Sequence, residues 1–534
     1  MHLSSTATRW LGLIAIALGV ALIVVDTTIV NVIVPSIVRD LGVTSAQAQW
    51  IQESYAIVFA ALLLVVGRVA DILGARRVFL TGVVLFGATS LLAGLAPTGA
   101  LLVVARFLQG AGAALILPTS LSLLNALFTG KARGQAFAVW GSTIGAATAL
   151  GPLLGGWLSE HASWRWAFGI NIPLVVVICL GAVAFLPRSP RTPGRVDVAG
   201  AALSIVGLGL LAFGLIEGRT YGWVVSIAPL RALGVSWTRG PSPVLVALVL
   251  AAAALAAFVV RQVALARATP AGQPTTALMD VRLFSIGSFR SGNVATLIIG
   301  LGEFGIVAVL PLWLQFALGY SPVQAGLALV PIAVGSFVAS GASFGLATSM
   351  SALGLVRLGL ALEAVGLVGL GMVARPDASW WAVAAALFVY GIGVGFATAQ
   401  VTNVVLAEVP EPSAGQGSGV QSVFRQLGSA LGIAVLTTTF FSIFTSRLGS
   451  DLTAAGLPAD QAHRLTSVVV GSAGAAIDGL AAAPQTAAVA DAARAAMAHG
   501  VALGSWLAAG FLLAGLLATL LIAPVTTTEA ALSR

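Results

Sequence analysis

The chain contains 534 residues, of which 58% are hydrophobic and only 8% are charged, and its mean hydropathy is +1.03. Soluble domains carry about 25% charged residues, so this composition excludes a soluble globular protein and predicts an all-α polytopic membrane protein. The formal net charge of +8 does not indicate binding to nucleic acid, because the arginines lie in short segments between apolar runs, as the positive-inside rule describes.

Cysteine and histidine are rare in this chain. The single cysteine, Cys179, excludes a disulfide within one chain. The four histidines show no spacing typical of metal ligands, so we expect no metal site and no cofactor. The apolar run that begins at Trp10 is too long for a signal peptide and has no small-residue cleavage pattern, so we interpret it as a retained first span.

Fourteen apolar runs reach the length of about 20 residues that a helix needs to cross a bilayer. An even number of spans places both termini on one side. With the N-terminus inside, fifteen basic residues fall in cytoplasmic segments and nine in external ones, which predicts a multi-pass plasma-membrane protein with cytoplasmic termini. The predicted spans are 10–36, 49–67, 78–96, 100–126, 135–158, 166–186, 198–217, 243–262, 290–316, 322–346, 351–374, 379–402, 418–445 and 501–523.

Residues 446–500 are rich in alanine but carry several charges, so they are not predicted to span the membrane. The topology places this loop outside the cell. The stretches Asp460–Val470 and Thr486–His499 are expected to form surface helices, arranged as a hairpin on the outer face. A flexible linker is the alternative interpretation.

The first span has one charged side chain, Asp26, within V-D-T-T-I-V-N-V-I-V-P at residues 25–35. A carboxylate that faces hydrocarbon costs several kcal/mol, so ionisable residues inside the membrane are functional candidates. Asn31 lies further along the same span. The alternative is that Asp26 is a structural acid whose hydrogen bonds fix the packing of helices.

The segment between the second and third spans reads G-R-V-A-D-I-L-G-A-R-R, residues 67–77. Its glycines, Gly67 and Gly74, permit tight turns. Asp71 precedes Arg76 and Arg77, and such charges can pair at the inner ends of helices in one conformation and separate in another. The pattern indicates a gate, with simple topology-determining charge as the alternative.

Spans four and five carry further motifs. Arg106 and Gln109 lie three residues apart and therefore on one helical face. The fifth span contains G-S-T-I-G-A-A-T-A-L-G-P-L-L-G-G, residues 141–156, whose small residues and proline favour a close, kinked helix pair. W-R-W-A-F-G-I-N-I-P follows at residues 164–173. Within residues 141–156, the motif G-P-x-x-G-G consists of Gly151, Pro152, Gly155 and Gly156.

Taken in this order, the five motifs resemble those of the major facilitator superfamily, and in particular its fourteen-span drug:proton antiporter branch (the EmrB/QacA type). The resemblance implies two six-helix bundles around a central cavity with two extra helices between them, divided at 1–190, 191–285 and 286–534. Spans 1, 4, 9 and 12 would line the cavity. The counterpart of the 67–77 loop in the second half, near 343–354, has no acid and no basic cluster, so the first-half gate is expected to dominate.

The resemblance also assigns roles to polar residues inside the predicted spans. Asp26 and Glu303 are expected to couple protons and recognise substrate, and Arg106 to partner a carboxylate or to gate. Glu53 is expected at the outer vestibule or as a second proton site, and Glu363 as an acid that faces the helix bundle. The further candidates for lining the cavity are Asn31, Gln109, Tyr390, Gln400, Asn403 and Arg425.

The implied function is proton-coupled efflux of lipophilic, cationic drugs by alternating access, with the proton gradient as energy source. A carboxyl group in a low-dielectric cavity holds a proton near neutral pH, and an arriving cation would displace it. The expected partners are a small-molecule substrate, protons and the lipid bilayer, and a monomer is expected. Dedicated export of an endogenous metabolite or lipid is the main alternative, and a non-transporting receptor or scaffold is a weaker one. No nucleotide-binding loop or hydrolase motif indicates an enzyme.

Overall fold

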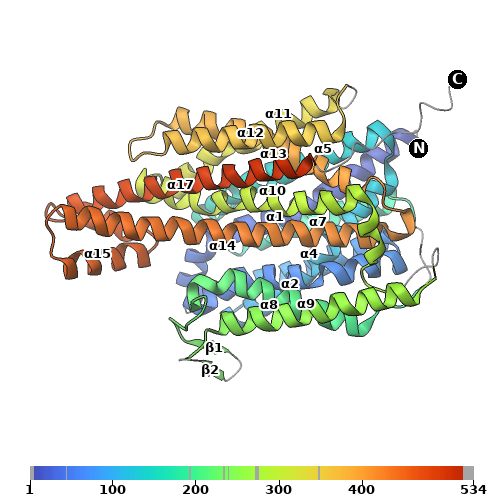
Figure 1. Ribbon diagram of the computed structural model, residues 1–534, viewed down its shortest axis with the longest axis horizontal. Coiled ribbons are helices and arrows are strands. Elements are labelled where there is room, and N and C mark those ends of the chain that lie inside the picture. The colour runs from blue at the N-terminus through green and yellow to red at the C-terminus, as the bar shows by residue number, and fades with distance from the viewer. Residues whose placement is uncertain are drawn as a thin grey trace.

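The computed structural model describes residues 5–43, 45–189, 191, 194–232, 235–237, 240–270, 276–346 and 349–520. Within these residues, fourteen helices are long and apolar enough to cross a membrane, which confirms the predicted number of spans. The helices run nearly parallel along the long axis of the molecule (Figure 1). The protein is therefore an all-α bundle of membrane-spanning length.

The first half of the chain supplies six spans. They are formed by α1 (Ser5–Leu41), α2 (Ser45–Leu73), α3 (Ala75–Gly94), α4 (Gly99–Leu127), α5 (Gly130–His161) and, as one span, α6 (Trp166–Gly169) with α7 (Asn171–Phe185). The helices α1 to α5 are longer than the apolar runs that predict them, because helices continue into polar residues beyond the hydrocarbon region. Buried apolar side chains from α1 to α5 and α7 form a core that extends to five helices later in the chain, and a smaller cluster joins α1 to α6.

Two additional helices follow, α8 (Val198–Tyr221) and α9 (Pro243–Ala268). They pack against each other, and α8 also contacts α2 and α14. Between them the chain forms a short antiparallel pair, β1 (Leu230–Ala232) and β2 (Val235–Trp237), which hydropathy did not predict. Span-length patterns carry no signal for strands of three residues.

The second half supplies the other six spans and the segment between the last two. Its elements are η1 (Val281–Ser285), α10 (Gly287–Leu312), η2 (Trp313–Ala317), α11 (Pro322–Leu346), α12 (Ala352–Val373), α13 (Trp380–Leu406), η3 (Glu411–Ser413), α14 (Ala414–Ala454), α15 (Ala459–Gly471), α16 (Ala476–Ala481) and α17 (Ala487–Thr519). Its buried apolar residues form a second core.

The segment 446–500 is helical, but not as predicted. Helix α14 continues to Ala454, and α17 already begins at Ala487, so Thr486–His499 is not a separate surface helix but mostly the first part of the last span's helix. The predicted helix at Asp460–Val470 corresponds to α15. These helices project beyond the others at the left of Figure 1. The predicted hairpin of two surface helices is therefore wrong for its second helix, and the alternative of a flexible linker is wrong as well. Alanine-rich sequence propagates a helix already started in the membrane.

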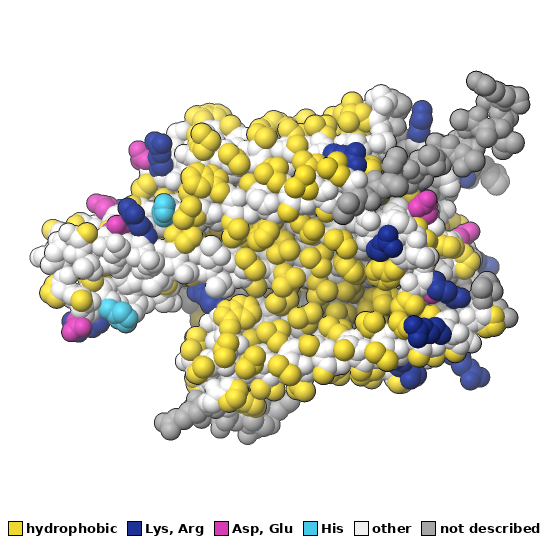
Figure 2. All heavy atoms as spheres, in the orientation of Figure 1, with side chains coloured by type: hydrophobic (Ala, Val, Ile, Leu, Met, Phe, Trp, Pro, Cys, Tyr) yellow, Lys and Arg dark blue, Asp and Glu magenta, His cyan; other side chains and the backbone are white. Residues whose placement is uncertain are grey.

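The surface divides along the long axis. Figure 2 shows hydrophobic side chains covering the middle of the visible face, while Lys, Arg, Asp and Glu side chains gather toward its two ends. An apolar band flanked by charged ends is what a bilayer requires of a spanning protein. We call the end at which α2 meets α3 the Asp71 end, and the end with α15 the opposite end.

Candidate functional site

Asp26 lies in a closed polar cluster within the first bundle. Its Oδ2 forms an ion pair with Nη1 of Arg106 at 2.5 Å, and both side chains are buried. Its Oδ1 accepts hydrogen bonds from Gln109 at 2.7 Å and from Asn171 at 3.0 Å. Each carboxylate oxygen therefore has a donor, and the charge of the acid is balanced by one guanidinium.

Four helices build this cluster, each by a separate side chain. Arg106 and Gln109 come from α4, Asn171 begins α7, and Ser90 of α3 accepts hydrogen bonds from both amides, at 2.8 Å and 3.1 Å. The i, i+3 spacing on α4 also lets Arg106 donate to the Gln109 carbonyl oxygen at 2.7 Å. A buried ion pair is stable only when its remaining polar atoms are satisfied, and this one meets that condition.

Helix α2 completes the surroundings of Arg106. Both contacts are with residues of α2. The Nε of Arg106 donates to the carbonyl oxygen of Ile51 at 3.0 Å, and the guanidinium carbon of Arg106 lies 4.5 Å from the ring centroid of Tyr55. The predicted neighbour Asn31 lies on α1, but its side chain falls outside the described residues. Arg106, Gln109 and Asp26 thus contact one another, and none of the three is exposed to a cavity in this conformation.

Glu303 lies in a different environment within the second bundle. It is on α10, 7% exposed, and its Oε1 accepts a hydrogen bond from Thr398 of α13 at 3.0 Å. Tyr390 of α13 donates its hydroxyl to the Glu303 carbonyl oxygen at 2.8 Å. Arg425 of α14 is close enough to act electrostatically on the carboxylate. Tyr390 therefore fixes the backbone of α10 rather than offering a ring to a ligand.

Arg425 lies at one of the places where the two bundles meet. Its guanidinium carbon lies 5.7 Å from the ring centroid of Phe304 on α10 and 5.9 Å from that of Trp140 on α5. Both distances are within the range of cation–π attraction. Trp140 itself donates to Ser120 of α4 at 3.2 Å. The half-buried Arg425 thus links the acid of one bundle to an aromatic side chain of the other.

Glu363 faces the helix bundle from α12, as the sequence predicted, and is fully buried. Within the described part of the chain, neither of its carboxylate oxygens has a hydrogen-bond partner. The charges of Glu303 and Arg425 act on it. The second bundle therefore brings together two acids and one base.

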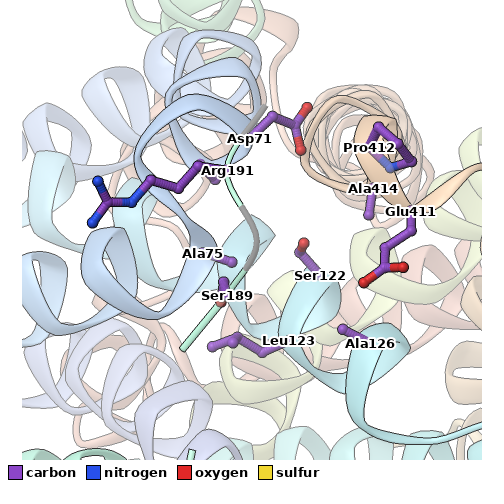
Figure 3. Close-up of a pocket in the computed structure, with 11 residues that line it drawn as sticks. Asp71, Ala75, Ser122, Leu123, Ala126, Ser189, Arg191, Glu411, Pro412 and Ala414 are labelled. Atoms are coloured by element: carbon purple, nitrogen blue, oxygen red, sulfur yellow. The ribbon is translucent and has the colours of Figure 1, made fainter. Parts of the chain in front are cut away.

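Asp71 bridges the bundles at the end named after it. Its Oδ1 accepts from the backbone N–H of Gly415 at 2.6 Å, and its Oδ2 from that of Gln416 at 3.0 Å. These are the first N–H groups of α14, which attract a negative charge. Figure 3 shows the Asp71 carboxylate turned toward α14, while Arg191 points away from it. A cavity of about 180 Å³ adjoins this contact.

The other residues of the predicted gate behave differently from expectation. Gly67 does not form a turn but lies within α2, where an added Cβ would lie 2.5 Å from the carbonyl oxygen of Gly415. Only Gly74 turns the chain, with φ of 92°. Arg76 donates to the carbonyl oxygen of Val183 at 2.7 Å instead of pairing with Asp71. Helix α14, and not the basic pair, holds the acid.

Arg77, the second basic residue of that pair, is exposed. It follows Arg76 in the first turn of α3, so its side chain leaves the helix about 100° further round, which is the rotation per residue at 3.6 residues per turn. A charged side chain that is exposed to water contributes little stabilising energy to a contact between helices. Arg77 therefore takes no part in the bridge.

A second bridge between the bundles lies between α5 and α13. Gln400 donates to the carbonyl oxygen of Gly134 at 3.0 Å, and Arg133 donates to Asn403 at 2.8 Å. Gln400 also donates to Ser343, in the segment that has lost its acidic and basic gate residues. Gln400 and Asn403 were predicted to line the cavity, but in this conformation they are buried in this clasp.

The motif of the fifth span packs α5 closely against its neighbours. A Cβ on Gly151 would collide with Thr28 of α1, and one on Gly155 would lie 2.9 Å from Ile29. Gly156 faces α11 of the other bundle, where Val323 is 3.3 Å from the position of such a Cβ. Small residues let helix backbones approach in this way. The side chain of Pro152 falls outside the described residues.

Glu53 is apart from both acidic clusters. It is half-buried on α2, and its charge, together with that of Glu217, acts on Tyr221 of α8. It thus lies where the additional helices join the first bundle. The described residues contain no group of three or more His, Cys, Asp or Glu side chains that could hold a metal ion.

Sequence reasoning missed several partners of these acids. Asn171 is part of the quoted motif at 164–173, so its signal was present without a role. Trp140, Arg133 and the N-terminus of α14 gave no signal, because their contacts join segments 260 or more residues apart or depend on the angle between helices. Trp164 and Arg165 of the same motif bind Asp40 near the end of α1.

Comparison with known proteins finds relatives that are named as transporters and efflux pumps. A sequence profile described as Major Facilitator Superfamily matches residues 16–433. The chain is 34% identical over 483 residues to the probable actinorhodin transporter of Streptomyces coelicolor, covering 86% of this chain and 79% of that protein. It is 32% identical over 512 residues to the multidrug efflux pump LfrA of Mycolicibacterium smegmatis, covering 95% of each. It is 30% identical over 468 residues to the multidrug resistance protein Stp of Mycobacterium tuberculosis, covering 87% and 82%.

Solved structures share the fold. The human organic anion transporter MFSD10 (TETRAN) matches with a TM-score of 0.60 and 14% identity, over 96% of this chain and 99% of its own. The proton:xylose symporter XylE matches with a TM-score of 0.56 and 15% identity, over 89% and 96%. At such identities the likeness concerns the fold alone. With the profile match, the relatives and the fourteen spans in agreement, the chain belongs to the Major Facilitator Superfamily and is a multi-pass membrane transporter rather than an enzyme.

Proposed function

We propose that this protein exports lipophilic, cationic compounds across the plasma membrane in exchange for protons, by alternating access. Its relatives include proteins named for multidrug efflux and for antibiotic export. The Asp71 end carries the basic segments around α2, α3 and α7, which supports cytoplasmic termini. Substrate would enter from that end and leave at the opposite one.

The observation that carries the proposal is the position of Glu303. It is a buried acid with one side-chain hydrogen bond, beside an arginine that touches an aromatic ring of the other bundle. A carboxyl group with few fixed donors can gain or lose a proton without the loss of a hydrogen-bond network. A cation that binds beside Glu303 competes with a proton for the negative charge of this acidic site, and this competition is exchange.

Asp26 would act in a different way in the same cycle. Its ion pair with Arg106 already neutralises it, so proton uptake there requires Arg106 to move away. We propose Glu303 as the acid that meets substrate, and Asp26 as the acid that holds α1 and α4 together until the bundles rearrange.

The two bridges at the Asp71 end supply the gate. The contact between Asp71 and α14 and the clasp between α5 and α13 both join the first bundle to the second. Opening toward the cytoplasm must break these bonds. Rocking of one bundle against the other would do so, as alternating access demands.

The experiment that tests the proposal uses inside-out vesicles that contain the reconstituted protein and a pH-sensitive dye. Addition of a monovalent lipophilic cation should drive proton movement that depends on Glu303. A parallel panel of divalent cations, neutral drugs and lipids defines the charge of the substrate. Proton movement that is identical in the wild type, Glu303→Gln and empty vesicles would refute the proposal.

Dedicated export of one endogenous compound is the second candidate. Relatives named as the probable actinorhodin transporter and as a cephamycin export protein favour it. A deletion strain that loses one extracellular compound but keeps its resistance to every toxic cation would select this candidate. The proton-coupling machinery would be the same.

A further inference from the structure

Glu363 is a fully buried acid within the second bundle that the proposed exchange at Glu303 does not use. It lies in the middle of α12 with an exposed fraction of 0%. Neither carboxylate oxygen has a hydrogen-bond partner among the described residues. An isolated carboxylate in such surroundings loses the hydration that stabilises its charge in water. The group is therefore stable there only if it carries a proton or gains a counter-charge.

The packing of α12 and α13 makes room for this carboxyl group. A Cβ added to Gly393 of α13 would lie 2.5 Å from Cγ of Glu363. The close approach continues at Gly359 and Gly366, which contact α13 near Ala397 and Tyr390. The side chain thus lies against the backbone of α13 at a position that has no side chain of its own.

The same helix α13 also holds Glu303 from its other side. Thr398 donates to the Glu303 carboxylate, and Tyr390 donates to its backbone carbonyl. The charged groups that act on Glu363 are Glu303 of α10 and Arg425 of α14, and the phenol of Tyr390 is within electrostatic reach. Helix α17, also packed on α12, presents Trp506 near Gly371. Two acids and one base thus form a single electrostatic unit.

Charge balance assigns the proton within this unit. With Arg425 as the one base, a single carboxylate is neutralised and the second acid must be protonated. Glu303 has a hydrogen-bond donor and lies beside the guanidinium, whereas Glu363 has no donor. The neutral carboxyl group is therefore Glu363. A bound monovalent cation would supply the second positive charge, so both acids could then be ionised.

We propose that Glu363 is a proton-binding site of this transporter, and that the proton displaced by one monovalent cation is the proton that Glu363 holds. This inference rests on the proposed proton-coupled export and identifies its proton carrier. The site alternates between one proton with Arg425 and one substrate cation with Arg425, and its net charge is zero in both states. One O–H bond of Glu363 breaks, Glu303 relays the proton by forming and then breaking one O–H bond, and the proton ends in a new O–H bond to water.

The test measures binding of tetraphenylphosphonium, which has a fixed single charge, to the full-length protein in lipid nanodiscs at several pH values. Where the site is protonated, displacement of one proton makes the affinity of the wild type rise about tenfold per pH unit. Glu363→Met should make the affinity independent of pH, because no proton is left to displace. Methionine has a similar volume and needs no hydrogen bond, so this variant should fold.

Asp377→Asn is the matched control, because Asp377 is an exposed acid in the loop between α12 and α13 of the same bundle. It should keep the tenfold slope. A wild-type slope that persists in Glu363→Met would overturn the assignment to Glu363 while leaving proton coupling intact. A wild type that binds with no pH dependence would overturn the proposed function and the assignment with it.

Infrared difference spectroscopy gives a second readout, which detects the protonated carboxyl group directly in the wild type. A carboxyl O–H in water-free surroundings has a distinct carbonyl band, which should vanish when tetraphenylphosphonium binds. Glu363→Gln should lack that band in the absence of ligand. A wild type without such a band, or with a band unchanged by the ligand, would also overturn the proposal.

Discussion

The two bundles each contain a buried acid close to an arginine, but they differ in how many hydrogen bonds and counter-charges the acid receives. In the first bundle, Asp26 has one arginine and two amide donors, so charge and hydrogen bonds are both satisfied. In the second, Glu303 and Glu363 share one arginine, and among the described residues Thr398 provides the one side-chain donor. The first arrangement is suited to holding helices together. The second can change its protonation without breaking a network.

The physical basis of this difference is the balance between desolvation and compensation. Removing a partner from a satisfied buried pair leaves an unpaired charge in low dielectric. An acid with few compensating partners loses less interaction energy when its protonation changes. A cation that binds nearby stabilises its ionised form and so favours release of the proton. Comparing the two regions therefore separates a structural acid from an exchanging one.

The largest effect should come from Asp26→Asn. This change leaves Arg106 buried without its counter-charge, so the free energy of unfolding should fall by about 3–5 kcal/mol. The loss can be followed as thermal unfolding in detergent. The double variant Asp26→Asn with Arg106→Met removes both charges and should recover much of the stability. If the double variant is as unstable as the single one, the ion pair is not the cause.

Glu303→Gln should have the opposite effect from Asp26→Asn, with a small loss of stability and a large loss of transport. The glutamine oxygen can still accept from Thr398, and Arg425 still stacks on two rings, so the loss of stability should be about 1 kcal/mol. Proton movement driven by a lipophilic cation should fall to the level of empty vesicles. Both quantities are measured on one preparation. A loss of stability as large as that of Asp26→Asn would remove the contrast between the bundles.

Asp71→Ala tests an acid that accepts two hydrogen bonds from a helix terminus and on which the charge of Arg68 also acts. Loss of the two bonds to the start of α14 should weaken the bridge by about 1–2 kcal/mol. Opening at this end should then become roughly 5–30-fold more populated. Spin labels at Leu73 and Glu411, both exposed, report the distance across the bridge in a Cys179→Ala background. Arg77→Ala, an exposed neighbour outside the contact, should leave the distance distribution unchanged.

The smallest effect is expected for Asp40, the exposed counterpart of Asp26 near the end of α1. The hydrogen bond from Arg165, with a second from Trp164, lowers the pKa of Asp40. A lowered pKa means that the pair stabilises the fold above the ordinary pKa of about 3.9 and that this contribution disappears as the pH falls below it. The contribution of this ion pair to stability is therefore constant between about pH 5 and 8.

Thermal unfolding of Asp40→Asn and wild type across pH 3–8 measures that contribution. The difference between the two should be slight near neutral pH, since Asp40 and Arg165 are 48% and 38% exposed, and should close in acid. Asp377→Asn serves as the control, because Asp377 is exposed and forms no ion pair with the residues that the structure describes. A difference that grows in acid would mean that another group controls the pH dependence.

Much of the fold followed from hydropathy, while the site followed only in part. The spans were predictable because each must be about 20 apolar residues long, and the acids because charge is rare within them. The pairing of Asp26 with Arg106 joins residues 80 positions apart on different helices, and Thr398 lies 95 positions from Glu303. Such contacts depend on helix rotation, which hydropathy does not record.

The helical extension beyond the membrane shows the same limit. Alanine-rich sequence permits both a surface helix and a continuation of the last span, because propensity sets whether a residue is helical and not what its helix packs against. Packing of Met497 and Phe440 in the second core settles that α14 and α17 continue side by side. The sequence alone could not select this outcome.

The sequence by itself determined that this chain is a fourteen-span membrane protein with acids in its first and ninth spans, since the cost of burying charge leaves a visible mark in an apolar run. Only the tertiary structure decided which acid is compensated. Compensation depends on side chains that different helices bring within about 3 Å. That geometry separates the closed pair at Asp26 from the under-compensated acids Glu303 and Glu363.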